Sequence, residues 1–339
     1  MKTSTALFGL ALSVPLVFSL LSGAAAQSYN FTDFDASGSG LATTVNSISN
    51  SGVVVGSYLN VNATNTNFSG TPSGTPPVFN PLNLSDTASA NGINSSNQIV
   101  GSDGGGGAFL LDSNGLTTLP LVDSTEASQA AFGINDGGVI VGQYFHSDGI
   151  ISSGFVGSGS SFSPIDPTGA AVNTSAQAIN DNGLVTGFYG TSGNPSFTHG
   201  FLFDTKTSAY TLLNDPVAND LASTQFLGIN DSGEAVGYYQ TNTGAQHGFL
   251  YNTHNTATNA YTFLNDPNTP TVGAPLMQIT GITNSGEIAG FYTDANQNQR
   301  GFIAMPAAAV PEASSVVSLS LLLLLGAGGL WAAKRRKVA

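Results

Sequence analysis

Hydrophobic and polar positions follow a pattern that returns six times along this chain. Each copy has an apolar segment ending in isoleucine, a polar turn of four residues, and a second apolar segment whose glycine lies eight positions after the isoleucine. Asn, Asp and Gly dominate the turns, and these residues favour tight reversals of the backbone. Each copy therefore predicts a β-hairpin. The six copies run from Ile48 to Gly56, Ile93 to Gly101, Ile134 to Gly142, Ile179 to Gly187, Ile229 to Gly237, and Ile282 to Gly290.

Two more strands are expected after each hairpin. The third strand is marked by phenylalanine in five copies, at Ala108-Phe109-Leu110, Gly154-Phe155-Val156, Gly200-Phe201-Leu202, Gly248-Phe249-Leu250 and Gly301-Phe302-Ile303. In the first copy the expected third strand is degenerate and consists of Val78-Phe79. The fourth strands are expected at Leu116–Leu119, Phe162–Ile165, Tyr210–Leu213 and Tyr261–Leu264. The last glycine of each hairpin indicates a close backbone approach or a bulge.

The spacing of the copies predicts a six-bladed β-propeller. Successive isoleucines lie 45, 41, 45, 50 and 53 residues apart, a period typical of four-stranded blades. The segment Tyr29–Asp35 resembles a fourth strand, whereas the last copy stops after its third strand. We therefore expect the N-terminal strand to complete the last blade, which closes the ring and removes open sheet edges. The repeat domain is assigned to residues 27–304, and an open solenoid or a two-sheet sandwich is the alternative.

The two ends of the chain read as targeting segments. Lys2, an apolar run over residues 6–21 and small residues at Ala24 and Ala26 predict a signal peptide over residues 1–26, with a membrane anchor as the alternative. Residues 316–333 carry no charge and are long enough for a transmembrane helix. Residues 305–315 are a linker, and residues 334–339 are a basic tail that should remain cytoplasmic. The basic residues of the tail are Lys334, Arg335, Arg336 and Lys337.

The C-terminal segment resembles the PEP-CTERM sorting signal of Gram-negative bacteria. Val310, Pro311, Glu312 and Ala313 precede the hydrophobic segment and the basic tail, although the third motif position is usually proline. The resemblance implies anchoring in the inner membrane, processing by an exosortase-type enzyme, and delivery to the cell surface or extracellular space. An ordinary C-terminal membrane anchor is the alternative.

The repeats themselves resemble the HAF-type extracellular repeats of bacterial exported proteins. The resemblance rests on the motif Gly-Ile-Asn-Asp, as in Gly228–Asp231, and on His247-Gly248-Phe249-Leu250-Tyr251. It implies an extracellular repeat protein and brings no enzymatic activity with it.

Charge and cysteine content narrow the functional classes. The chain has no cysteine, which excludes disulfides and thiol chemistry. Between residues 27 and 310 the only basic residues are Lys206 and Arg300, so that region is strongly acidic. Such a surface repels nucleic acid and is compatible with divalent cations and neutral polymers.

Two sets of residues recur at equivalent repeat positions and are candidate binding groups. His199, His247 and Arg300 precede the Gly-Phe of three copies, and we consider a ring of polar groups that binds an anionic ligand. The alternative is that each is held by a local hydrogen bond. The turn residues Asp136, Asp181 and Asp231 could bind calcium, the only cofactor considered, or could simply form the turns.

No catalytic constellation is evident in the sequence. We therefore expect a non-enzymatic surface or matrix protein that binds extracellular polysaccharide or another envelope component. The alternatives are a glycan-active hydrolase or lyase, which needs acidic groups converging at one mouth of the ring, and a purely structural coat protein.

Overall fold

The computed structural model describes residues 28–38, 41–123, 125–167, 171–191, 194–213, 221–255, 260–270 and 275–307. These residues belong to one compact unit, Ser28–Ala308, and all regular structure within the described ranges is β. No helix in these ranges is long and apolar enough to cross a membrane. The predicted signal peptide, sorting motif, transmembrane segment and basic tail lie outside the described residues.

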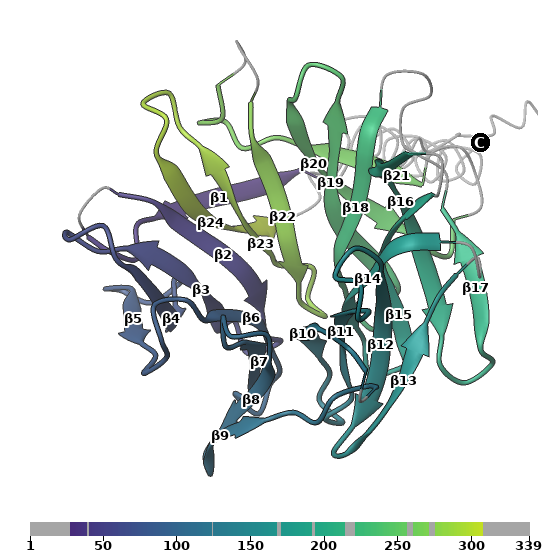
Figure 1. The fold of residues 1–339 in the computed structure, drawn as a ribbon. Helices are drawn as coiled ribbons and strands as arrows, with labels where there is room; N and C mark the ends of the chain where they lie inside the picture. The colour runs from purple at the N-terminus through teal and green to yellow at the C-terminus, as the bar shows by residue number, and fades with distance from the viewer. Residues whose placement is uncertain are drawn as a thin grey trace, which may run out of the picture. The chain divides into compact units, whose positions relative to one another are not determined.

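The strands form six antiparallel sheets of four strands, each of which is one blade (Figure 1). Blade 1 contains β2 (Thr43–Ile48), β3 (Val54–Leu59), β4 (Asn65–Thr71) and β5 (Val78–Pro81). Blade 2 contains β6 (Ser89–Ile93), β7 (Ile99–Ser102), β8 (Ala108–Asp112) and β9 (Gly115–Thr118). Blade 3 contains β10 (Ser128–Ile134), β11 (Ile140–Phe145), β12 (Ser152–Ser158) and β13 (Ser161–Ile165).

The remaining blades follow the same order along the chain. Blade 4 contains β14 (Ala171–Ile179), β15 (Leu184–Thr191), β16 (Asn194–Asp204) and β17 (Ala209–Leu212). Blade 5 contains β18 (Leu221–Ile229), β19 (Glu234–Thr241), β20 (Gln246–Asn252) and β21 (Tyr261–Leu264). Blade 6 contains β22 (Met277–Ile282), β23 (Ile288–Thr293), β24 (Gln299–Pro306) and the N-terminal strand β1 (Tyr29–Phe34). The predicted six-bladed propeller is thereby confirmed.

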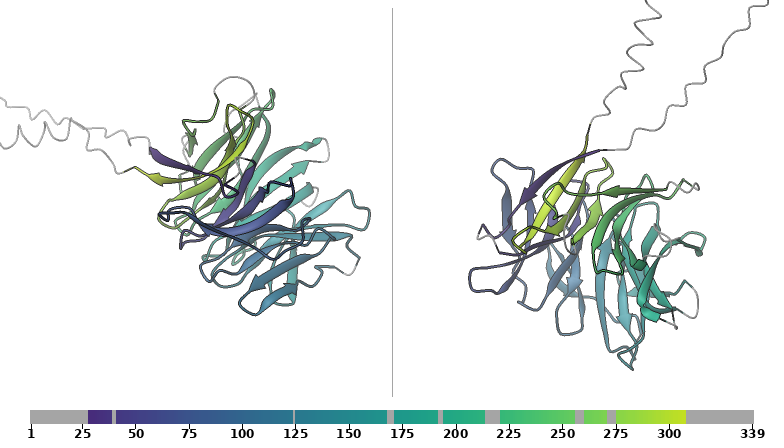
Figure 2. Two further views of the ribbon diagram at one scale, coloured as in Figure 1. Left: turned by 90° about the vertical axis from the view of Figure 1, so that its left-hand side faces the viewer. Right: turned by 90° about the horizontal axis from the view of Figure 1, so that it is seen from above.

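The N-terminal strand closes the ring, as the sequence predicted. Strand β1 pairs antiparallel with β24, from Tyr29 opposite Pro306 to Phe34 opposite Gly301. The N–H of Ala307 donates to the carbonyl of Ser28 at 2.8 Å and extends the ladder by one step. Both views in Figure 2 show the purple strand β1 beside the yellow strand β24. Blade 6 is therefore built from both ends of the described chain.

The assignment of the third strand in blade 1 was wrong. Val78 and Phe79 lie in the fourth strand, β5, and the third strand is β4 with Phe68 at its centre. The glycine that precedes phenylalanine in four other blades is Asn67 here, so the Gly-Phe signal is absent. Asn67 is buried because its side chain joins blade 1 to blade 2. Its Oδ1 accepts from the N–H of Ala90 and its Nδ2 donates to the carbonyl of Ala88, each at 2.9 Å.

Each hairpin glycine lies directly opposite the phenylalanine of the third strand. Gly142 pairs with Phe155, and a side chain at Gly142 would overlap the carbonyl oxygen of Ala130 and lie 2.6 Å from the Phe155 ring. The equivalent phenylalanines are nearly fully buried in all six blades, and burial of such a ring contributes roughly 1.5–3 kcal/mol. The phenylalanines are Phe68, Phe109, Phe155, Phe201, Phe249 and Phe302. The close approach of a first-strand carbonyl, which all six glycines share, therefore explains why the repeat keeps glycine, and the phenylalanine ring adds to it at Gly101, Gly142 and Gly290.

The first strand of every blade has a β-bulge at the place where its carbonyl approaches the hairpin glycine. The register of β10 shifts between Ala131 and Gly133, opposite Gly142, so that Phe132 is the extra residue. The other five extra residues are Asn46, Asn91, Gln177, Leu227 and Thr280. Both sequence expectations for the glycine, a close approach and a bulge, are confirmed.

Candidate functional site

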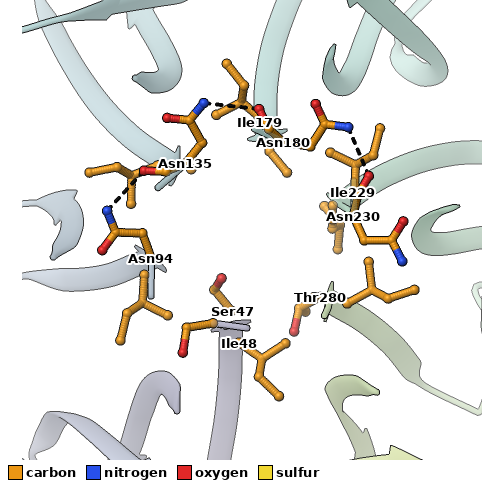
Figure 3. A pocket seen from close by; sticks show the side chains of 18 of the residues that line it. Ser47, Ile48, Asn94, Asn135, Ile179, Asn180, Ile229, Asn230 and Thr280 are labelled. Carbon is orange, nitrogen blue, oxygen red and sulfur yellow. Dashed lines mark hydrogen bonds between the residues drawn. The ribbon is translucent and has the colours of Figure 1, made fainter. Parts of the chain in front are cut away.

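The first strands of the six blades enclose a central channel. Its cavity measures about 300 Å³ and is lined by residues of β2, β6, β10, β14, β18 and β22, together with the turns that follow them. Figure 3 looks into this cavity and shows isoleucine and asparagine side chains arranged around it. A propeller places the first strands of all its blades around one axis, so residues about 45 positions apart in the sequence meet here.

The six bulge residues face this channel. All six are among its lining residues, and five of them are half-buried, whereas Thr280 is buried. Each stands two positions before the isoleucine of its repeat, and none carries a charge. Three amides, one phenyl ring, one alkyl group and one hydroxyl group are therefore contributed to the wall by these six positions. Sequence reasoning missed these residues, although comparing this position across the six copies could have found them.

A ladder of asparagine side chains joins the blades at one level of the channel (Figure 3). In each case the side-chain Nδ2 donates to the backbone carbonyl at the same repeat position in the next blade. The bonds run from Asn94 to Asn135 at 3.0 Å, from Asn135 to Asn180 at 3.1 Å, from Asn180 to Asn230 at 2.9 Å, and from Asn230 to Thr283 at 3.1 Å.

The same asparagines also fix their own turns. Oδ1 of Asn180 accepts from the N–H of Leu184 at 2.9 Å, and Oδ1 of Asn135 accepts from Val139 at 2.9 Å. Both ends of each amide are thus used within the protein. These asparagines hold the ring together and present few polar groups to a ligand.

The three aspartates considered for calcium come together at one mouth of the channel. They lie in the turns after β10, β14 and β18, and all three line the cavity. Each of them also bonds to the neighbouring blade, a contact that the sequence did not predict. Asp136 Oδ1 accepts from the N–H of Ser95 at 2.7 Å, Asp181 Oδ1 from Asp136 at 2.8 Å, and Asp231 Oδ1 from Asp181 at 2.8 Å. They form a second ladder between blades.

Burial raises the pKa of the middle carboxyl of this row, that of Asp181. Desolvation is the largest cause, the hydrogen bond from the Asp136 N–H lowers the pKa, and the charges of Asp136 and Asp231 raise it. The described ranges contain no group of three or more His, Cys, Asp or Glu side chains placed to hold a metal ion. Calcium binding at these residues stays a prediction.

His199, His247 and Arg300 are not brought together at the axis. Each lies on the third strand of its own blade, opposite Tyr189, Tyr239 and Tyr292 respectively, and none lines the channel. The imidazoles of His199 and His247 lie on their tyrosine rings, with centroids 5.7 and 5.1 Å apart. Nε of Arg300 contacts Asp294 at 3.2 Å and its Nη1 contacts Asp35 at 3.5 Å. A shared ligand-binding role for these residues stays a prediction.

A third imidazole occupies the corresponding place in blade 3 and was missed. The ring of His146 lies 5.1 Å from that of Tyr144, and its Nε2 is 3.0 Å from Oγ of Ser153. Ser153 stands at the repeat position of His199 and faces Tyr144 across the sheet. The imidazole comes from the preceding loop instead of the third strand, so the repeat pattern does not reveal it.

Residues 111–294 match the family described as "Protein of unknown function (DUF3466)". None of the curated proteins matches the chain.

Several solved structures share the propeller fold at low identity. A subtype N11 neuraminidase-like protein of A/flat-faced bat/Peru/033/2010 is 12% identical with a TM-score of 0.47, over 84% of this chain and 95% of that chain. A variant of the Aleuria aurantia lectin in complex with alpha-methyl-L-fucoside is 13% identical with a TM-score of 0.44, over 85% and 97%. A variant of AofleA from Arthrobotrys oligospora is 9% identical with a TM-score of 0.49, over 81% and 86%. These similarities concern the fold alone.

Proposed function

Because the chain belongs to the DUF3466 family, whose function is unknown, we propose a role from the geometry of its channel: an exported protein that binds neutral sugar units of an extracellular polysaccharide without cleaving them. The central channel is the binding site in this proposal.

The observation that carries the proposal is the ring of six uncharged bulge residues on the channel wall, which combines polar and apolar groups. A cavity of about 300 Å³ has room for a small ligand or for the end of a chain. Sugars present hydroxyl groups at their edges and C–H groups on their faces, so amide side chains and an aromatic ring are suitable partners. Asn46, Asn91 and Gln177 supply the amides, and Phe132 supplies the ring.

Some of these amides keep an oxygen available for hydroxyl donors. Asn46 uses its Nδ2 to bond the carbonyl of Ala90 at 2.8 Å, and Gln177 uses its Nε2 to bond Oγ of Ser175 at 2.7 Å. Within the described part of the chain, no donor reaches Oδ1 of Asn46 or Oε1 of Gln177. The free groups are therefore acceptors, which favours a ligand rich in hydroxyl donors.

The strand boundaries are compatible with processing at both expected sites. Strand β1 begins at Tyr29, three residues after Ala26, and β24 ends at Pro306, four residues before Val310. Cleavage of a signal peptide and of a PEP-CTERM-type signal would leave every strand of the propeller in place. The proposal therefore includes export, transient anchoring in the inner membrane, processing by an exosortase-type enzyme, and a location at the cell surface or beyond it.

Calorimetric titration tests the binding function directly. The ligands are the polysaccharide secreted by the producing organism and a panel of neutral oligosaccharides. We expect Phe132→Arg to weaken binding at least tenfold, because the longer cationic side chain fills the channel. Val61→Arg is the matched control, since Val61 is 80% exposed in a surface loop of blade 1. Equal binding by wild type and Phe132→Arg would exclude the channel as the site.

A second candidate function, glycan hydrolysis, is favoured by the row of Asp136, Asp181 and Asp231 at the channel mouth. Paired carboxylates are the usual catalytic groups of glycosidases, and a carboxyl with a raised pKa is suited to act as the acid. Release of new reducing ends from the polysaccharide, abolished in Asp181→Asn, would establish this activity. Binding without release supports the non-enzymatic function. The amide oxygen introduced by that substitution would still accept from the N–H of Asp136, so the turn should keep its bond to the neighbouring blade.

A further inference from the structure

A second pair of carboxyl groups lies away from the channel, where the ring closes. Asp33 is an exposed residue of the closing strand β1, and Asp266 follows β21 in the connection from blade 5 to blade 6. Asp266 is only 2% exposed. Its carboxyl lies beside that of Asp33, although the two residues are more than 230 positions apart in the sequence. The pair thus connects the first strand to the connection between blades 5 and 6.

The hydrogen bonds around the pair are unevenly distributed. Oδ2 of Asp33 accepts from Nδ2 of Asn268 at 2.6 Å and from the hydroxyl of Tyr292 at 2.8 Å. Oδ1 of Asp266 accepts from the N–H of Asn268 at 2.7 Å. Oδ2 of Asp266 is buried, and no described residue donates a hydrogen bond to it. The group next to this oxygen is the carboxylate of Asp33, which is also a hydrogen-bond acceptor.

A buried carboxylate oxygen without a donor is costly, and two ionised carboxylates side by side repel each other. One proton removes both problems, because protonated Asp266 can donate its O–H to the Asp33 carboxylate. We propose that a proton held on Asp266 and donated in a hydrogen bond to Asp33 is a pH-sensitive latch that holds strand β1 in the ring. The proposal is independent of what the channel binds.

The surrounding charges do not supply a substitute for the proton. From β23, Tyr292 donates to Asp33, and Asp294 lies just beyond the strand. Arg300 of β24 already forms ion pairs with Asp294 and Asp35. Desolvation, together with the hydrogen bond and charge of Asp33, raises the pKa of Asp266 to about 7, against a lowering by the Asn268 N–H. The proton is therefore retained well above the ordinary range of aspartate.

The direction of the pH effect follows from linkage. In the open state, where water reaches Asp266 and Asp33 no longer lies beside it, Asp266 titrates near its ordinary pKa of about 4. Between about pH 4 and 7 the closed ring holds a proton that the open state has lost, so rising pH favours opening. The equilibrium constant for opening rises by at most about tenfold for each pH unit, and it levels off above the pKa of Asp266 in the closed state. The latch is thus strongest in acid.

Amide hydrogen exchange on the full chain in detergent tests the latch. We expect the protection of residues 28–35, corrected for the intrinsic pH dependence of exchange, to fall several-fold per unit between pH 5 and 7. The hairpin of β10 and β11 should show no such trend and serves as an internal control. In Asp266→Asn the amide donates to Asp33 at every pH, so protection of β1 should be independent of pH. The exposed Asp86→Asn should behave as wild type.

Two results would overturn the proposal. One is an equal slope in wild type and Asp266→Asn. The other is a rise in β1 protection with calcium chloride at pH 8 in wild type and not in the variant, which would assign the pair to a cation. If Asp266→Asn does not fold, Asp33→Asn provides the same test, because its amide can donate to Asp266 and should likewise remove the slope.

Discussion

At the scale of the residue, glycine sets the distance between the first and second strands. The repeat keeps glycine opposite the buried phenylalanine because the adjacent carbonyl and the aromatic ring leave no room for a methyl group. That reason could not be read from the sequence, which indicated only that glycine marks a bulge or a close approach. The structure shows that the two possibilities are not alternatives, because the close approach and the bulge occur together in every blade.

Gly142→Ala should destabilise the domain by about 1–3 kcal/mol, the usual cost of overpacking a tight core. The new methyl group would have to displace backbone atoms of β10 or the Phe155 ring. Urea unfolding measures the effect. Gly105→Ala is the control, because Gly105 lies in a surface turn where a methyl group meets only the Asp103 side chain at 3.4 Å. A loss below about 0.5 kcal/mol at Gly142, within the usual effect of a surface change, would contradict this explanation.

At the scale of the element, the hairpin turns join neighbouring blades as well as strands. The sequence predicted the turns correctly, and Asn97 adopts a left-handed backbone, with a φ of 60°, at the place where the other five turns have glycine. It did not predict that asparagine and aspartate of one turn would bond to the next turn around the ring. That contact depends on how closely adjacent blades pack, which no local pattern encodes.

Asn180→Ala should cost more than the loss of one turn bond. It removes the acceptor for the Leu184 N–H and one of the two donors to the Asn230 carbonyl, which keeps its bond from the Gly233 N–H. A loss of about 1–3 kcal/mol is expected from the unpaired N–H and the broken bond between blades. Thermal unfolding compared with the exposed Asn62→Ala measures it. A change no larger than that of the control would show that the ladder contributes little.

The elements that sequence reasoning misplaced lie where the repeat departs from its own pattern. Five third strands were found through phenylalanine preceded by glycine or alanine, and blade 1 was missed because the polar Asn67 stands at that place. The channel wall was missed for a different reason. The bulge residues vary among amide, hydroxyl and apolar types, so no residue type marks them, although all six stand two positions before the isoleucine of their repeat.

At the scale of the whole molecule, the closing strand should decide whether the propeller is a single cooperative unit. A chain that begins at Ala36 lacks β1 and leaves the edge of β24 unpaired. Exposed strand edges favour association between chains. We expect a lower melting temperature and oligomers in size-exclusion chromatography with light scattering.

A synthetic peptide of residues 28–35 should reverse both effects when added in excess, because it can pair with β24. A peptide with Phe31 and Phe34 replaced by serine is the control, since these rings pack on blade 6 and blade 1. A monomeric truncated chain that melts like the full domain would mean that closure is dispensable.

The hydrogen bond between Ala307 and Ser28 also has a consequence for how the chain can be rewired. Since the two ends of the propeller are neighbours on one blade, a linker of a few residues could join them, and new ends could be opened in a surface loop such as that at Asp148 to Ile150. In such a circular permutant the new chain ends lie in blade 3, where no Asp33–Asp266 pair holds a terminal strand. The ring of the permutant would still be closed, but its closure would no longer depend on pH.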